Sequence, residues 1–88
     1  MINDDKLNKL RELLEAQYDW PTVYTFKFIA PKDQVHEVEA LFPGVPVEKK
    51  NSRNGNYVSV TVSVELSSSD HVIAVYEQAA KIKGLISL

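Results

Sequence analysis

Few side chains in this sequence could carry out acid–base or nucleophilic chemistry. Its two histidines, His36 and His71, could act as general bases or metal ligands. Carboxylates that could assist them lie nearby in the sequence at Glu37, Glu39 and Asp70. The histidines fall on different predicted helices with no ligand spacing between them. This favours two solvated helix residues over a catalytic or metal site.

Residues 67–69 are three consecutive serines, one of which could serve as a nucleophile. Ser67 stands three residues before Asp70, the spacing of a capping box at the start of a helix. Capping accounts for these serines, and no set of residues combines a nucleophile, a base and a group that orients the base. We therefore predict a protein that is not an enzyme, with no catalytic residue, no metal site and no cofactor.

Basic residues around an expected hairpin turn form the strongest candidate for a binding site. Asn54-Gly55 is a strong turn signal, because both residue types tolerate positive φ angles. Such a cluster suits a carboxylate or phosphate on an effector or partner, with Arg53 as the bidentate contact. Lysines that protect a sheet edge from pairing explain Lys49 and Lys50 equally well. The candidate ligand-binding or partner-binding residues are Lys27, Lys49, Lys50, Arg53 and Tyr57.

Length and composition place these residues in one small folded domain. The chain has 88 residues, of which 44% are hydrophobic and 25% charged, as in ordinary globular proteins. A chain this short buries roughly 60% of its unfolded surface, which leaves little for a deep catalytic cleft. The absence of cysteine excludes disulfides, thiolate chemistry and cysteine-based metal sites. We expect a single domain over residues 1–88, with a leading helix at about 4–18 and a core at about 20–88.

Charge and hydropathy exclude two classes of partner. Ten basic and twelve acidic residues give a net charge of −2, without the basic surplus that neutralises nucleic-acid phosphates. No apolar stretch approaches the length of a membrane span, and the polar, acidic residues 1–5 are unlike a signal peptide. We therefore expect a soluble cytoplasmic protein with no nucleic-acid or membrane partner.

The spacing of hydrophobic residues predicts three helices and four strands. A leucine stripe marks the leading helix, which ends near Trp20 because Pro21 disfavours helical geometry in the residue before it. Valines alternate with polar residues over 58–66, which is the clearest strand. The elements after the leading helix are a strand at 23–29, a helix at 33–42, an edge strand at 45–50, the strand at 58–66, a helix at 69–82 and a strand at 85–88.

The order strand–helix–strand–strand–helix–strand predicts an α+β, ferredoxin-like sandwich. Its four-stranded antiparallel sheet should have the order 4-1-3-2, with both helices on one face. The expected core residues are Phe26, Phe28, Val38, Leu41, Val60, Val62, Val64, Ile73 and Tyr76. The open face should be polar, and on that side only Tyr57, at the start of the third strand, is aromatic, which argues against RNA binding by base stacking. Its central-strand residues are Thr25, Lys27, Ser59, Thr61 and Ser63.

One run of residues is similar to a known family. Gly55-Asn56-Tyr57-Val58-Ser59-Val60-Thr61 is the specific part, and Trp20-Pro21, the strand at 24–29 and Val75-Tyr76-Glu77 agree with it. Together they resemble the YbeD-like family of small bacterial proteins. The resemblance implies a ferredoxin-like fold similar to ACT-type regulatory domains, a link to lipoate metabolism, and a regulatory role without catalysis. The leading helix is an addition to that family pattern.

Two functions follow as expectations. The first is a regulatory or ligand-sensing domain that binds a small anionic effector. The second is a protein–protein interaction module that docks through its sheet edge or its leading helix and binds no small molecule. The polar sheet face could be left to water, covered by the leading helix or paired with a second copy, and the last arrangement would give a homodimer.

Overall fold

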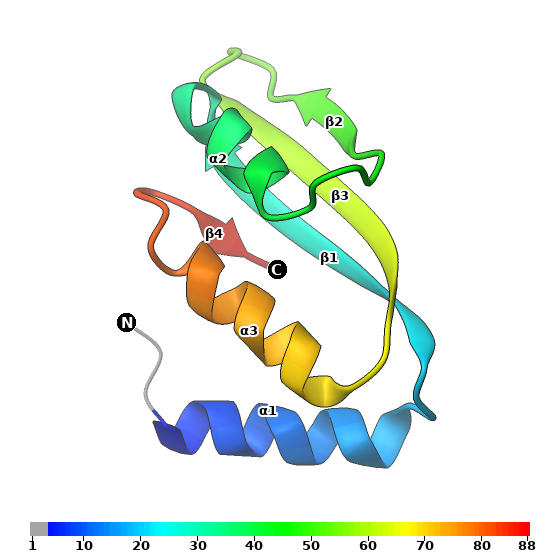
Figure 1. Cartoon of the computed structure of the whole chain (residues 1–88). Coiled ribbons are helices and arrows are strands. Elements are labelled where there is room, and N and C mark those ends of the chain that lie inside the picture. Colours follow the sequence, from blue (N-terminus) through cyan, green and yellow to red (C-terminus); the bar gives the residue numbers. More distant parts are fainter. Residues whose placement is uncertain (1–3) are drawn as a thin grey trace.

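Two ten-residue strands form the centre of the sheet in a computed structural model, which describes residues 4–88 (Figure 1). β1 (Thr22–Pro31) and β3 (Tyr57–Leu66) are antiparallel and pair along their whole length. The short strands β2 (Glu48–Asn51) and β4 (Ile86–Ser87) lie at the two edges, so the order is β2-β3-β1-β4. The predicted antiparallel sheet of order 4-1-3-2 is therefore confirmed.

Two helices cover one face of this sheet (Figure 1). α2 (Val35–Ala40) follows a 3-10 turn, η1 (Lys32–Gln34), and α3 (Ser69–Ala79) follows β3. Both helices are shorter than the predicted 33–42 and 69–82, because tighter turns form at their ends. Their position on one side of the sheet confirms the ferredoxin-like arrangement.

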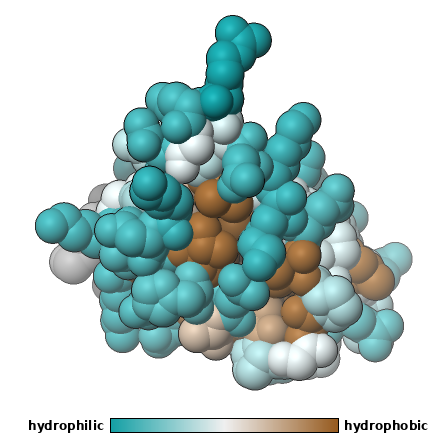
Figure 2. Space-filling model, turned by 90° about the horizontal axis from the view of Figure 1, so that it is seen from above, coloured by the Kyte–Doolittle hydropathy of each residue, from teal (hydrophilic) through white to brown (hydrophobic). Residues whose placement is uncertain are grey.

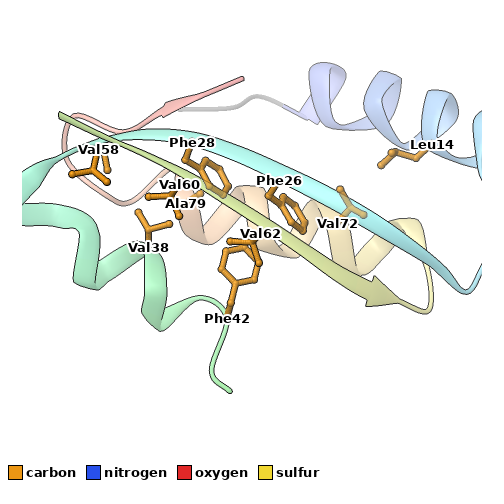
Figure 3. Close-up of a cluster of buried hydrophobic side chains, with 11 residues drawn as sticks. Leu14, Phe26, Phe28, Val38, Phe42, Val58, Val60, Val62, Val72 and Ala79 are labelled. Carbon is orange, nitrogen blue, oxygen red and sulfur yellow. The ribbon is translucent and has the colours of Figure 1, made fainter. Parts of the chain in front are cut away.

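The core lies between the sheet and these helices (Figure 3). Alternate residues of the central strands point into it, as the pleat of a β-strand requires. The fully buried hydrophobic side chains are Phe26, Phe28, Ala30, Val38, Val60, Val62 and Val72. Ile73 is also buried, whereas Val64, Leu41 and Tyr76 are partly buried and pack around the cluster. Six of the nine predicted core residues are thus buried and the other three lie at its margin.

The leading helix, α1 (Asp4–Gln17), packs against α3 (Figure 1). Arg11 Nε donates a hydrogen bond of 3.0 Å to Asp70 Oδ1. Ser69 Oγ donates one of 2.5 Å to Glu15 Oε1, and Ser69 is itself buried. Two polar contacts therefore hold α1 at the first turn of α3, outside the sandwich proper.

The open face of the sheet is not covered by α1. Of the leucine stripe, Leu14 is buried with 4% of its surface exposed, whereas Leu13 is 56% exposed. The polar residues predicted for the open face are exposed, except Thr61, which is partly exposed. Within residues 4–88 the open face is thus left to solvent. No helix in this part of the chain combines the length and the apolar character needed to cross a bilayer.

The predicted capping box at the start of α3 is wrong. The cap position is Ser68, whose side chain makes no capping hydrogen bond. Ser67 Oγ lies 2.9 Å from His71 Nδ1, and Asp70 faces Arg11 on α1. The hydroxyl and the carboxylate have other partners, and the spacing of residues along the chain does not reveal them.

Gly84→Ala should lower the free energy of unfolding by about 2 kcal/mol, and Gly44→Ala by about 1 kcal/mol. Both glycines have a φ of +77°, in the left-handed region that alanine disfavours. A Cβ on Gly84 would also lie 2.9 Å from Pro31 Cγ at the end of β1, whereas a Cβ on Gly44 would meet no atom within 4 Å. Urea unfolding of the two variants measures the difference. Equal losses would contradict the steric role of Pro31.

Candidate functional site

The hairpin between β2 and β3 positions most of the predicted site residues. Ser52 N donates a hydrogen bond of 2.8 Å to Tyr57 O, which closes the loop. Gly55 N donates one of 3.0 Å to Ser52 O, and Gly55 has a φ of +76°, a conformation that glycine adopts without steric cost. The turn predicted from Asn54-Gly55 is therefore present, with the positive φ at Gly55.

Hydrogen bonds made by the side chains of the loop stabilise its conformation. Ser52 Oγ accepts a hydrogen bond of 3.1 Å from Tyr57 N and donates one of 3.0 Å to Asn54 Oδ1. Asn54 Oδ1 also accepts from Asn56 N at 3.1 Å. On the far side of the loop, Lys32 N donates a hydrogen bond of 3.0 Å to Asn56 O. These bonds hold the loop against the end of β1, so the residues on either side of the turn have defined positions.

A hollow of about 150 Å³ opens beside the hairpin on the open face of the sheet. The residues that line it are Ile29, Lys50, Asn51, Ser52, Tyr57 and Ser59. The register explains how they meet, because Lys50 lies opposite Ser59 and Ser59 lies opposite Ile29. Figure 2 shows the hairpin side of the molecule, where hydrophobic surface is visible between hydrophilic side chains.

The structure brings two of the five predicted site residues into this hollow. Lys50 and Tyr57 line it, and Tyr57 is 44% exposed. Lys27 is on the same face two residues before Ile29, beside the hollow but not in its lining. Arg53 is exposed in the loop next to it.

Lys49 is separated from the other four. It lies opposite Val60, a buried core residue, so its side chain is on the helix face of the sheet. Its Nζ lies 3.3 Å from Glu39 Oε1 of α2, and this ion pair neutralises its charge. Lys27, Lys50 and Arg53 have no ion pair within residues 4–88. Lys27 and Lys50 therefore present positive charge on the open face without a carboxylate partner within residues 4–88.

Ile29 and Ser59 are lining residues that sequence reasoning did not include in the site. Both lie on central strands with side chains on the open face, as the alternation of β1 and β3 predicts. What that alternation does not show is that Ile29 pairs with Ser59 beside the hairpin. The long β1–β3 register, which carries β1 as far as Pro31, places them there.

Two larger hollows have a different chemistry. One of about 370 Å³ lies between the ends of α2 and α3, where Glu37 accompanies Lys81 and Lys83. The other, of about 430 Å³, lies along β2 and is lined by Glu48 without a basic residue. Of the three hollows, the one at the hairpin alone combines an aromatic ring with a lysine and no carboxylate.

The histidines lie outside these hollows. His36 Nε2 is 3.5 Å from Glu37 Oε1 on α2, and His71 of α3 contacts Ser67, which precedes that helix. Residues 4–88 contain no group of three or more histidines, aspartates or glutamates placed to hold a metal ion.

Tyr76, part of the family resemblance, belongs to the core rather than to the hollow. Its hydroxyl lies 3.1 Å from that of Tyr24, and its ring meets Phe26 edge-on at 5.4 Å. Burial, and then the hydrogen bond with Tyr24, raise the pKa of the Tyr76 hydroxyl above its usual value. Tyr76 is therefore a neutral packing residue, and its place in the resemblance reflects the fold.

Comparisons with known proteins agree with the resemblance at the level of the family. A UPF0250 protein of Haemophilus influenzae is 31% identical over 93 aligned positions, which cover 97% of this chain and 96% of the relative. A UPF0250 protein of Shewanella putrefaciens is 31% identical over 75 positions, covering 76% and 84%. No solved structure matches the chain. The model of the family described as "Protein of unknown function (DUF493)" matches residues 15–87, and the chain therefore belongs to this family of small bacterial proteins.

Proposed function

We propose that this protein is a small cytoplasmic regulatory domain, without catalytic activity, that binds an anionic effector in the hairpin hollow. The observation that carries the proposal is that Lys50 and Tyr57 line one hollow and that Lys50 has no ion pair with a carboxylate of residues 4–88. A free cation beside an apolar wall can recognise a small molecule that has an anionic group and a short apolar part.

The size of the hollow limits the effector. A volume of about 150 Å³ is below the roughly 300–1,000 Å³ of pockets that enclose drug-sized ligands. A carboxylate or phosphate with a few carbon atoms fits this space. Lys50 would contact the anion, Arg53 could reach it from the loop, and Tyr57 and Ile29 would cover the apolar part.

The family resemblance supports a regulatory role over a catalytic one. Similarity to ACT-type domains implies a module that senses a small molecule, and no set of side chains in residues 4–88 combines a nucleophile with a base beside the hollow. The link to lipoate metabolism makes lipoyl compounds the first ligands to test, followed by amino acids and nucleotides.

A thermal-shift screen tests the proposal. A ligand at a hundred times its Kd should stabilise the fold by about 2.7 kcal/mol, which gives a clear rise in Tm. The double variant Lys50→Glu, Arg53→Glu should abolish the shift at low salt, where screening of surface charge is weakest. The double variant Lys9→Glu, Lys81→Glu carries the same change in net charge away from the hairpin and should keep the shift.

Two results would overturn the anion site. One is a ligand-induced shift that survives in the Lys50→Glu, Arg53→Glu variant while its unfolding curve remains cooperative. The other is the absence of any shift across the whole panel. The second result would favour the alternative function, a protein-interaction module that docks through its sheet edge or through α1.

A further inference from the structure

β2 is an edge strand with one side free. Among residues 4–88 it pairs with β3 alone, and all four of its residues, Glu48–Asn51, are exposed. Lysines on an edge often protect it from pairing. At this edge, however, Glu48 and Lys50 lie on the same face and carry opposite charges. An edge whose charges served only to prevent pairing would not need both signs.

The hydrogen-bond pattern shows which backbone groups are free. Ser52 N bonds to Tyr57 O, so Ser52 is turned toward β3, and antiparallel pairing turns every second residue the same way. Lys50 and Glu48 therefore bond to β3. The backbone N–H and C=O groups of Lys49 and Asn51 point outward and are free to pair with another strand.

The charged residues of β2 are arranged so that two copies of this strand could place opposite charges together. Glu48 and Lys50 flank Lys49 and share the open face, because they lie opposite Thr61 and Ser59. Neither has an ion pair within residues 4–88. Lys49, on the other face, is already neutralised by Glu39 at 3.3 Å.

We infer that β2 pairs antiparallel with β2 of a second copy, about a two-fold axis at Lys49, to form a continuous eight-stranded sheet. In this register Lys49 lies opposite Lys49 of the second copy, and their outward N–H and C=O groups bond to each other. Glu48 then lies opposite Lys50 of the second copy. By the two-fold symmetry, Lys50 lies opposite Glu48 of the second copy, so the interface contains two such pairs. Opposite charges placed directly across two strands stabilise the pairing.

The other registers lack this match. An axis at Glu48 would place two glutamates opposite each other, and an axis at Lys50 would place two lysines opposite each other. The axis at Lys49 also sets two lysines opposite each other, but each is beside Glu39 and this register adds two pairs of opposite charge that the other two registers lack. The hollow of about 430 Å³ beside Glu48 leaves room for the stem of Lys50 from the second copy.

Charge reversal tests the register. Glu48→Lys and Lys50→Glu should each weaken the dimer about tenfold, because each replaces two attractive pairs with two repulsive ones. The double variant Glu48→Lys, Lys50→Glu should restore the affinity of the wild type. Sedimentation velocity should show a mass near twice 9.9 kDa at high concentration. Because small interfaces are weak, the series should extend to roughly 1 mM. A 9.9 kDa species throughout, or a double variant as weak as the single ones, would overturn the inference.

A disulfide gives an independent measurement in this cysteine-free chain. Across a hydrogen-bonded antiparallel pair the Cα atoms are about 5.5 Å apart, within the range of a disulfide, so Lys49→Cys should cross-link on mild oxidation. Asn51→Cys is the matched control, because two copies of residue 51 would be roughly 14 Å apart along the paired strands. Equal cross-linking of the two variants would exclude this register.

The dimer and the anion site can fail separately. Glu48 does not line the hairpin hollow, so Glu48→Lys should weaken the dimer without weakening ligand binding. Arg53→Glu lies outside β2 and should do the reverse. Loss of both properties in either variant would indicate a folding defect, which the unfolding curve of that variant would show.

Discussion

Phe26→Ala should lower the free energy of unfolding by about 3–5 kcal/mol, the usual cost of removing a buried phenylalanine ring. Phe26 has no exposed surface and lies at the centre of β1. Its ring centroid is 4.8 Å from that of Tyr24, 5.3 Å from Phe42 and 5.4 Å from Tyr76. The variant therefore loses contacts with β1, with the segment after α2 and with α3 together.

The size of this loss matters in a chain of 88 residues, whose total stability is expected to be about 4–13 kcal/mol. Urea unfolding followed by circular dichroism measures it. Phe26→Leu keeps most of the volume and should cost less, which covers the case in which the alanine variant does not fold. Thr25→Ala, on the opposite face of the same strand, should change stability by less than about 1 kcal/mol. Similar losses for Phe26→Ala and Thr25→Ala would contradict the assignment of the two faces of β1.

The sheet could be predicted because its signal is local. Valines at every second position over 58–66 determine which face of β3 is buried, and the same alternation at Tyr24, Phe26 and Phe28 determines the face of β1. With both faces known, the element order leaves few ways to join the strands, and the order 4-1-3-2 is one of them. The turn at Asn54-Gly55 followed from residue type alone.

The candidate site was only partly predictable because it depends on contacts between distant segments. Alternation alone puts Lys49 and Lys50 on opposite faces, yet the ion pair of Lys49 with Glu39 requires α2 to lie over β2. Likewise the capping box failed because Asp70 meets Arg11, which is 59 residues away in the sequence. Local spacing predicts which residues could interact, and tertiary packing decides which of them do.

Lys50 connects the two proposals made for this molecule. Its side chain lines the hairpin hollow, and the residue also lies in register to meet Glu48 of a second copy. A small anion and a carboxylate of the partner strand would then compete for the same charge. Binding of the effector and pairing of the edges are therefore expected to be linked, which is a direct route from a small ligand to a change of assembly.

Leu14→Ala should lower the free energy of unfolding by about 2–5 kcal/mol, although α1 lies outside the sandwich. Figure 3 places Leu14 beside the start of α3, near Val72, and only 4% of its surface is exposed. The family model begins at residue 15, but the relative from Haemophilus influenzae aligns over 97% of this chain, so α1 is shared with that relative and is not an addition to the family pattern. A large loss would mean that this helix is part of the folded core and not an attached segment.

Leu13→Ala is the matched control, because Leu13 is the adjacent residue of the same helix and 56% of its surface is exposed. It should change the free energy of unfolding by less than about 0.5 kcal/mol. The contacts of Arg11 with Asp70 and of Glu15 with Ser69 are polar and remain in both variants, so the difference between them isolates the burial of the Leu14 side chain. Hydrogen exchange in α1 gives a second measurement. If Leu14→Ala left stability unchanged and α1 amides exchanged freely in the wild type, α1 would be detached in solution, and its exposed leucines would be open to a partner.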